Sequence, residues 1–356
     1  MPTAVSTYGF INAKLRGRIS KLLSEEFFLQ MARSRSLIEA MVLLKGTSYT
    51  EAVETYNRTG DIRLCELDLT RIEWQGLRTL DRFVPEAIKP FAQAILERYE
   101  VSTLKNALRL SFERIVRGRP VDDKVAYFLR GDGITDLPLD LIINAADLDD
   151  LEQVMMTTRY GEILADSLHG VGPSESLFGV EVALDRWYFE HLLEAASTLS
   201  RADEKVARRL IGIQIDIQNL NWLVRMGQFH RAEGVGLASS VVPGGALFGL
   251  DDLEKAFRTD RPLEPLMAAL GSRYAGLIPQ AGPTQERDHL RRLGLLEEIL
   301  RTVLFHEIRR TLGGFPFTVG TMLAYLLLLQ NEVRVLTSIL NAKYYDLPAS
   351  RVEGLI

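Results

Sequence analysis

The chain has 356 residues, 47% of them hydrophobic, and a formal net charge of −5 at pH 7. A chain with this mildly acidic balance lacks the basic surface that a nucleic-acid partner requires, so no such partner is expected. Its single cysteine, Cys65, excludes an intrachain disulfide and is typical of a reducing compartment. The opening residues Met1–Thr7 contain no basic segment followed by an apolar one, so we expect no signal peptide.

Apolar residues recur every three or four positions along most of the chain, which is the period of an amphipathic helix. Alternation of β-branched residues over the length of a strand is nearly absent. The sequence therefore predicts an all-α fold. The strongest predicted helices cover residues 20–45, 90–117, 182–198, 202–226, 287–312 and 318–342.

Glycine and proline, which end helices through their backbone geometry, predict the breaks between these helices. Breaks are expected at 117–120, 227–236 and 341–348, and further glycine loops at 131–133, 244–249 and 313–314.

The most apolar run, Phe315–Leu329, is shorter than the roughly 20 apolar residues that a membrane-spanning helix needs. It follows a glycine- and proline-containing turn, and Thr318 is suited to cap a helix that begins there. The run predicts a buried helix, and we do not expect the chain to cross a membrane.

One short pattern occurs three times at a constant interval of 116 residues. Each copy has an acid, Glu100, Asp216 or Glu332, followed by apolar residues at offsets +1, +4, +7 and +8. A fixed period of this length predicts three copies of one helical unit, over residues 1–118, 119–234 and 235–356. Two weaker echoes support the repeat. Leu148–Glu152 recurs as Leu250–Glu254, and Phe189 and Leu192 align with Phe305 and Ile308.

The three acids Glu100, Asp216 and Glu332 have two interpretations. They form equivalent carboxylates that face a partner around a shared axis, or each is a helix-surface residue paired with a nearby arginine. We favour the surface interpretation, because charged residues usually stay solvated unless they are paired.

The aspartate pairs Asp149–Asp150 and Asp251–Asp252 resemble the start of an aspartate-rich magnesium site. Such a site needs a further carboxylate one turn on, but Gln153 and Lys255 occupy those positions. We therefore favour acids in the first turn of two helices, where they complement the helix dipole.

No other motif indicates catalysis, a cofactor or a metal. The dipeptide Gly-Lys of a phosphate-binding loop is absent, and the glycines at 131–133 and 170–172 predict turns. His306–Glu307 lacks the second histidine of a zinc protease, because Arg310 stands there, and its counterpart Glu190–His191 favours a structural or surface role. The five histidines are His169, His191, His230, His289 and His306.

Segments at both ends of the chain are similar to one known family. Tyr8–Arg16 resembles its first helix, and its carboxyl-terminal signature is matched by Phe315–Gly320, Ala324–Leu326 and Asn331–Arg334. The family is that of the C subunits of archaeal and bacterial V/A-type rotary ATPases, whose eukaryotic counterpart is the d subunit. In addition to these end segments, the 116-residue repeat covers nearly all of the chain.

The resemblance implies a funnel of three similar helical units with pseudo-threefold symmetry. It implies a non-catalytic rotor subunit, without cofactor or bound nucleotide, that receives the central stalk and rests on the membrane proteolipid ring. Such a protein is peripheral to the membrane, on its cytoplasmic face, and couples ion transport to ATP synthesis or hydrolysis. Arg16, Arg18 and Arg334 are candidate contact residues. The alternatives are a helical metal-dependent enzyme that uses the aspartate pairs, and a generic helical scaffold.

Overall fold

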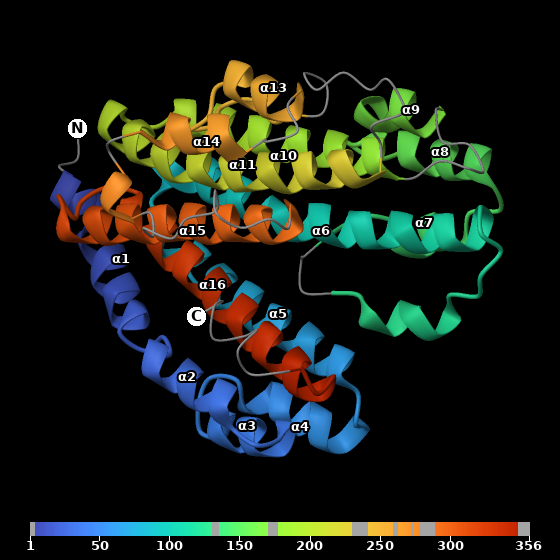
Figure 1. Cartoon of the computed structure of the whole chain (residues 1–356), viewed down its shortest axis with the longest axis horizontal. Coiled ribbons are helices and arrows are strands. Elements are labelled where there is room, and N and C mark those ends of the chain that lie inside the picture. The colour runs from blue at the N-terminus through green and yellow to red at the C-terminus, as the bar shows by residue number, and fades with distance from the viewer. Residues whose placement is uncertain are drawn as a thin grey trace.

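The computed structural model describes residues 4–129, 135–169, 177–229, 241–258, 263–271, 274–277 and 289–347. Within these ranges the chain forms 15 α-helices and no strand, which confirms the all-α prediction (Figure 1). The helices are α1 (Ala4–Ile19), α2 (Glu25–Arg33), α3 (Leu37–Leu44), α4 (Thr50–Thr59), α5 (Ile62–Arg78), α6 (Lys89–Ile115), α7 (Leu139–Asn144), α8 (Leu148–Met156), α9 (Gly161–His169), α10 (Phe178–Ser197), α11 (Arg201–Phe229), α13 (Leu250–Arg258), α14 (Leu263–Leu270), α15 (His289–Gly313) and α16 (Gly320–Tyr344).

Five of the six strongest predicted helices correspond to α6, α10, α11, α15 and α16. The prediction of one helix over residues 20–45 is wrong, because two helices, α2 and α3, occupy this segment. The break is set by a local capping box. The Ser36 hydroxyl accepts the backbone N–H of Glu39 at 3.2 Å, and the Glu39 carboxylate accepts that of Arg35 at 2.6 Å. This exchange satisfies N–H groups that a new helix start leaves unpaired.

The predicted breaks are partly confirmed. Gly118 ends the turn after α6 with a φ of +62°, and residues 244–249 lie in a loop. Helices α11 and α16 continue beyond the expected breaks at 227 and 341, to Phe229 and Tyr344. The predicted loops at 131–133, 170–172 and 231–236, and Pro348, lie outside the described residues.

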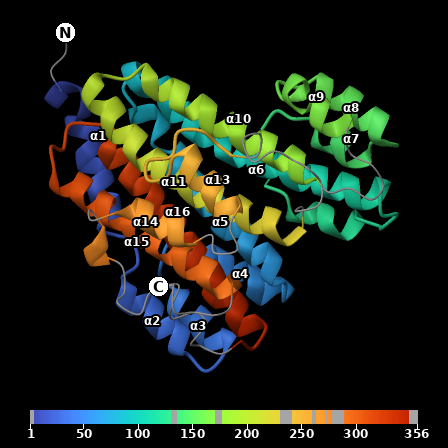
Figure 2. The ribbon, with the colours of Figure 1, turned by 45° about the horizontal axis from the view of Figure 1, so that its top comes forward.

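The long helices pack against one another, and short helices separate α6 from α10 and α11 from α15 in the chain. Helix α6 packs on α10, α11 on α15, and α16 on α5 and α1. The short helices α2–α4, α7–α9 and α13–α14 lie at three separate places around the long ones (Figures 1 and 2). The long helices are therefore brought together in the middle of the molecule.

Helix α16 is the most deeply embedded of the long helices. It is long and apolar enough to cross a membrane, but 67% of its most apolar window is buried inside the fold, as in a core helix. Its second half, residues 333–342, completes a separate apolar core with α2, α3, α4 and α5. At its start Asp203 accepts the N–H of Val319 at 2.9 Å, and Thr318 accepts that of Gly320 at 3.2 Å. The predicted buried helix is confirmed.

Candidate functional site

A cavity of about 290 Å³ lies between α6, α10, α11, α15 and α16. Its apolar wall includes Phe189 and Phe305, which occupy equivalent positions of the sequence repeat. Its polar wall carries arginine and amide side chains: Arg98, Gln214, Gln218, Arg301, Gln330 and Arg334.

The polar wall follows the sequence repeat. Arg98, Gln214 and Gln330 are spaced by 116 residues, each two positions before one of the repeated acids, and all three line the cavity. Gln218 and Arg334, also 116 residues apart, lie one helical turn beyond Gln214 and Gln330. Positions four apart share one face of a helix, so α11 and α16 each present two polar side chains to the cavity. Equivalent positions from all three sequence copies therefore meet at one place.

The repeated acids point away from this cavity. A residue two positions from a helix face is turned by about 200° from it, which directs the acid to the opposite side. Glu100, Asp216 and Glu332 are accordingly absent from the lining, and each bonds to a segment of short helices or loop. The interpretation in which the acids face a partner around a common axis is therefore not supported by their placement.

Arginines dominate the electrostatics of the cavity. Arg98 is exposed and donates to the Gln330 side-chain oxygen at 3.3 Å, and Arg334 donates to Asn331 at 2.8 Å. Burial, together with the nearby Arg301 guanidinium, lowers the pKa of Arg334 to about 10. Arg301 itself bonds to Glu297 at 2.5 Å. The described lining contains three arginines and no carboxylate.

Glu332 joins the end of the chain to its beginning. It is 4% exposed and accepts the Tyr49 hydroxyl at 2.6 Å and the Leu23 backbone N–H at 2.5 Å. Burial raises the pKa of Glu332, while these two hydrogen bonds act in the opposite direction.

Glu100 makes the equivalent contact in the first copy. It accepts the Tyr160 hydroxyl at 2.7 Å and is also paired with Arg159 at 2.6 Å. Tyr160 sits in the same local turn as Tyr49: the N–H of each tyrosine donates to the hydroxyl of the threonine two residues before it. The two tyrosines are therefore structural counterparts.

Asp216 is held differently. It is fully buried and accepts the backbone N–H groups of Ala246, Leu247 and Phe248 at 2.9, 2.8 and 3.3 Å. Burial raises the pKa of Asp216 to about 7, against the lowering effect of these donors. A Cβ atom at Gly245 would clash with the Asp216 carboxylate, so only glycine lets the loop approach this closely.

The surface interpretation of the acids is thus correct for Glu100, which is partly exposed and ion-paired with Arg159. It is wrong for Asp216 and Glu332, which are buried and bonded to backbone N–H groups or a tyrosine. Their partners are supplied by segments 30 to 309 residues away, so no neighbouring arginine indicates them.

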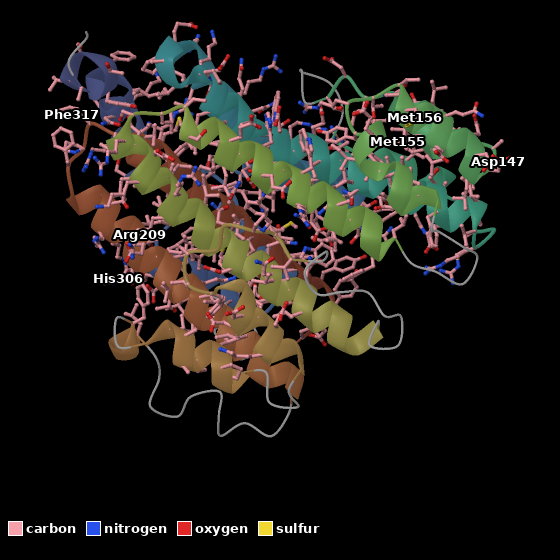
Figure 3. All side chains as sticks on the ribbon, turned by 90° about the horizontal axis from the view of Figure 1, so that it is seen from above. Asp147, Met155, Met156, Arg209, His306 and Phe317 are labelled. Atoms are coloured by element: carbon pink, nitrogen blue, oxygen red, sulfur yellow. The ribbon has the colours of Figure 1, made fainter. Side chains whose placement is uncertain are left out.

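The aspartate pairs lie in the first turns of α8 and α13, as predicted. Asp150 accepts the N–H of Ala146 at 2.7 Å, and Asp252 accepts that of Gly249 at 3.0 Å. Asp147 is the cap of α8, at the end of the molecule far from Phe317 (Figure 3). The second aspartate of each pair therefore closes the start of its helix, and the described residues contain no group of three or more potential metal ligands.

The histidines whose side chains are described lie outside the cavity. The ring of His191 stacks on Trp187, and its Nε2 atom lies 3.3 Å from Glu97. His306 is exposed on α15, next to the buried Glu307, which is ion-paired with Arg209 (Figure 3). His230 and the side chains of His169 and His289 lie outside the described residues.

Of the three candidate contact arginines, only Arg334 lines the cavity. Arg16 donates to the carbonyl of Leu312 at 2.8 Å, and Arg18 donates to the Thr79 hydroxyl at 2.8 Å. These two hydrogen bonds join α1 to neighbouring parts of the fold. Arg98, Gln214 and Gln330 were missed by sequence reasoning, although the 116-residue register applied to the neighbours of the acids points to them.

Residues 11–355 match the family model described as ATP synthase (C/AC39) subunit. The chain belongs to this family. Two A-type ATP synthase C subunits, from Methanocaldococcus jannaschii and Methanosphaera stadtmanae, are each 23% identical to it. These alignments cover 99% and 98% of this chain, and 86% and 87% of the relatives. That of Thermococcus onnurineus is 24% identical over 98% of this chain and 90% of its own. The C/AC39 assignment confirms the resemblance seen at both ends of the sequence.

Proposed function

We propose that this chain is a non-catalytic rotor subunit of a V/A-type ATPase or ATP synthase. In this role it is a socket that couples the central stalk to the membrane proteolipid ring during ion transport. Membership of the C/AC39 family supports the assignment to such a complex. The socket role is carried by one observation: Arg98, Gln214 and Gln330, from three sequence copies, line one cavity between the long helices.

The contacts of the repeated acids support three units, over residues 1–118, 119–234 and 235–356, that close on one another. Each acid bonds to the next unit: Glu100 to Tyr160, Asp216 to residues 246–248, and Glu332 back to Tyr49 in the first. The first unit contacts the second, the second contacts the third, and the third contacts the first. A closed ring of contacts of this kind fits a funnel with pseudo-threefold symmetry. Such closure suits a part that surrounds a shaft.

Transmission of torque needs a body that does not deform. Close-packed helices have low compressibility and transmit strain, and the long helices here share one continuous apolar core. A protein of this kind attaches to the polar loops of a membrane ring without a spanning helix of its own. We therefore place it at the cytoplasmic face of the membrane, held there through the ring.

Binding to the proteins of the central stalk tests the proposal directly. Purified chain is expected to capture the central stalk in a pull-down and to co-purify with the proteolipid ring from membranes, and to hydrolyse no nucleotide alone. Gln214→Trp, which fills the cavity, is expected to weaken stalk binding about tenfold, equivalent to roughly 1.4 kcal/mol. Gln153→Trp on the exposed face of α8 is the matched control. Absence of stalk binding by the unaltered chain contradicts the socket role.

A further inference from the structure

Arginine is the only charged residue type in the described lining of the cavity, and behind the wall Asp185 accepts the Gln218 amide at 2.8 Å and pairs with Lys105. Arg98, Arg301 and Arg334 line the cavity, and the described lining holds no aspartate or glutamate. Arg301 is paired with Glu297, which lies outside the lining. Arg98 and Arg334 donate to the amide oxygens of Gln330 and Asn331 inside the cavity.

Neutral amide oxygens are weaker acceptors for guanidinium groups than carboxylates are. A guanidinium presents a planar fork of donors that matches a carboxylate in a bidentate geometry, with hydrogen bonds roughly twice as strong as neutral ones. Burial and the neighbouring Arg301 lower the pKa of Arg334, against the raising effect of Glu297. An incoming carboxylate offsets the two effects that lower it.

We propose that the part of the central stalk that enters this cavity presents aspartate or glutamate side chains to Arg98, Arg301 and Arg334. This inference rests on the proposed socket function and names the chemistry of its occupant. The side-chain amide of Gln214 supplies further N–H donors on the same wall, and that of Gln218 has a second N–H besides the one it donates to Asp185 at 2.8 Å. A protein segment is favoured over a free anion because the donors come from α6, α11, α15 and α16 on several sides.

Isothermal titration calorimetry with the purified central-stalk complex tests the inference. Gln214→Glu and Gln330→Glu each add a carboxylate to the wall with almost no change in shape. Repulsion between like charges is expected to weaken stalk binding on the order of tenfold at low salt. Gln153→Glu makes the same chemical change on the exposed face of α8 and is expected to leave the affinity unchanged. Thermal melts of the free variants verify that each is folded.

Arg98→Gln provides a second measurement, because Arg98 is exposed. It is expected to weaken binding and to reduce the dependence of the affinity on salt concentration. If the unaltered chain binds the stalk but both glutamate variants bind equally well or more tightly, the acidic occupant is wrong and the socket function stands. If the unaltered chain does not bind the stalk, both proposals are wrong.

Sodium citrate, compared with sodium chloride at equal ionic strength, separates a stalk carboxylate from a free anion. Competition of citrate with the stalk in calorimetry supports the inference. If citrate stabilises the free chain, but neither citrate nor the two glutamate variants change stalk binding, the cavity is a small-anion site. That result overturns the inference of an acidic stalk segment.

Discussion

The Tyr49 hydroxyl donates to the Glu332 carboxylate at 2.6 Å, although 283 residues separate the two in the chain. Tyr49 lies in the turn that leads into α4, and Glu332 lies in the middle of α16. Both side chains are buried, so the hydrogen bond fixes the last long helix against the first group of short helices. Its counterpart between Tyr160 and Glu100 adds an ion pair with Arg159, a difference that can be measured.

Tyr49→Phe is expected to lower the free energy of unfolding by about 1–3 kcal/mol, because the buried Glu332 loses one of its two donors. Tyr160→Phe removes the equivalent hydroxyl, but Glu100 keeps Arg159 and is partly exposed, so a smaller loss is expected. Urea denaturation of both variants measures the difference. Equal losses contradict the assigned role of the Tyr49 hydroxyl.

Asp216 is expected to make stability depend on pH. Because burial raises its pKa from 3.8 to about 7, the folded state binds the proton more tightly than the unfolded state. The stabilising contribution is full below about pH 4 and is lost as the pH rises through 7. The slope from this group reaches at most about 1.4 kcal/mol per pH unit.

Urea denaturation between pH 4 and pH 8 tests the role of Asp216. Asp216→Asn is expected to remove this component of the slope, and Asp149→Asn, at an exposed position, is the control. Parallel pH profiles for wild type and Asp216→Asn argue against the assignment.

Arg209 neutralises the buried Glu307 and also donates to Tyr274 at 2.7 Å. Although burial acts to raise the pKa of Glu307, the pairing with Arg209 holds it below its usual value. Arg209→Met removes the nearer of two arginines from this buried carboxylate, since Arg310 remains at 3.4 Å, and is expected to destabilise the protein by roughly 2–4 kcal/mol at pH 7. Arg208→Met breaks only an exposed pair with Glu204, for which less than about 0.5 kcal/mol is expected.

The penalty of Arg209→Met is expected to shrink in acid. The stability that the lowered pKa of Glu307 provides is present above its ordinary value of 4.5 and is lost as the pH falls through the folded value. Denaturation at pH 7 and pH 4 measures this change. A penalty that is the same at both values contradicts the pairing.

Substitutions of Asp147 and Asp149 distinguish a role in helix capping from a role in metal binding. The Asp147 carboxylate accepts the N–H of Asp150 at 2.9 Å, so Asp147→Ala is expected to cost about 0.5–2 kcal/mol. Asp149 is exposed, and Asp149→Ala is expected to have little effect. Thermal melts with and without Mg²⁺ are expected to coincide for both variants and for Asp251→Ala. If Mg²⁺ raises the melting temperature of the unaltered chain, and Asp149→Ala or Asp251→Ala abolishes that increase, the metal interpretation is supported instead.

Local periodicity was sufficient to predict the five longest helices, α6, α10, α11, α15 and α16, but not α1, α5 or the breaks between short helices. Helices α6, α11 and α16 carry the apolar stripe in full, so their hydrophobic pattern identifies them. Residues 20–45 have the same period, yet they contain a break that the period does not reveal. There the Ser36 hydroxyl accepts the N–H of Glu39, and the Glu39 carboxylate accepts that of Arg35. A pattern of burial records which face is covered, and capping hydrogen bonds decide where a helix starts.

The candidate site was harder to predict, because its parts are defined by partners far away in the chain. The repeat correctly singled out Asp216 and Glu332 as special positions, but their burial depends on residues 246–248 and on Tyr49. The cavity residues are ordinary surface types, arginine and glutamine, at positions where only the three-dimensional arrangement brings them together. The sequence shows that Arg98, Gln214 and Gln330 are spaced by 116 residues, but it does not show that the three side chains line one cavity.

The core shared by residues 333–342 and helices α2–α4 has a consequence for synthesis of the protein. These helices are made early, and 283 further residues are translated after Tyr49 before its partner Glu332 is present. At 5–20 residues per second this takes about 15 to 60 s, during which the part of this core that residues 333–342 fill is uncovered. A chaperone that shields the nascent chain over that interval protects the protein from aggregation until its last helix arrives.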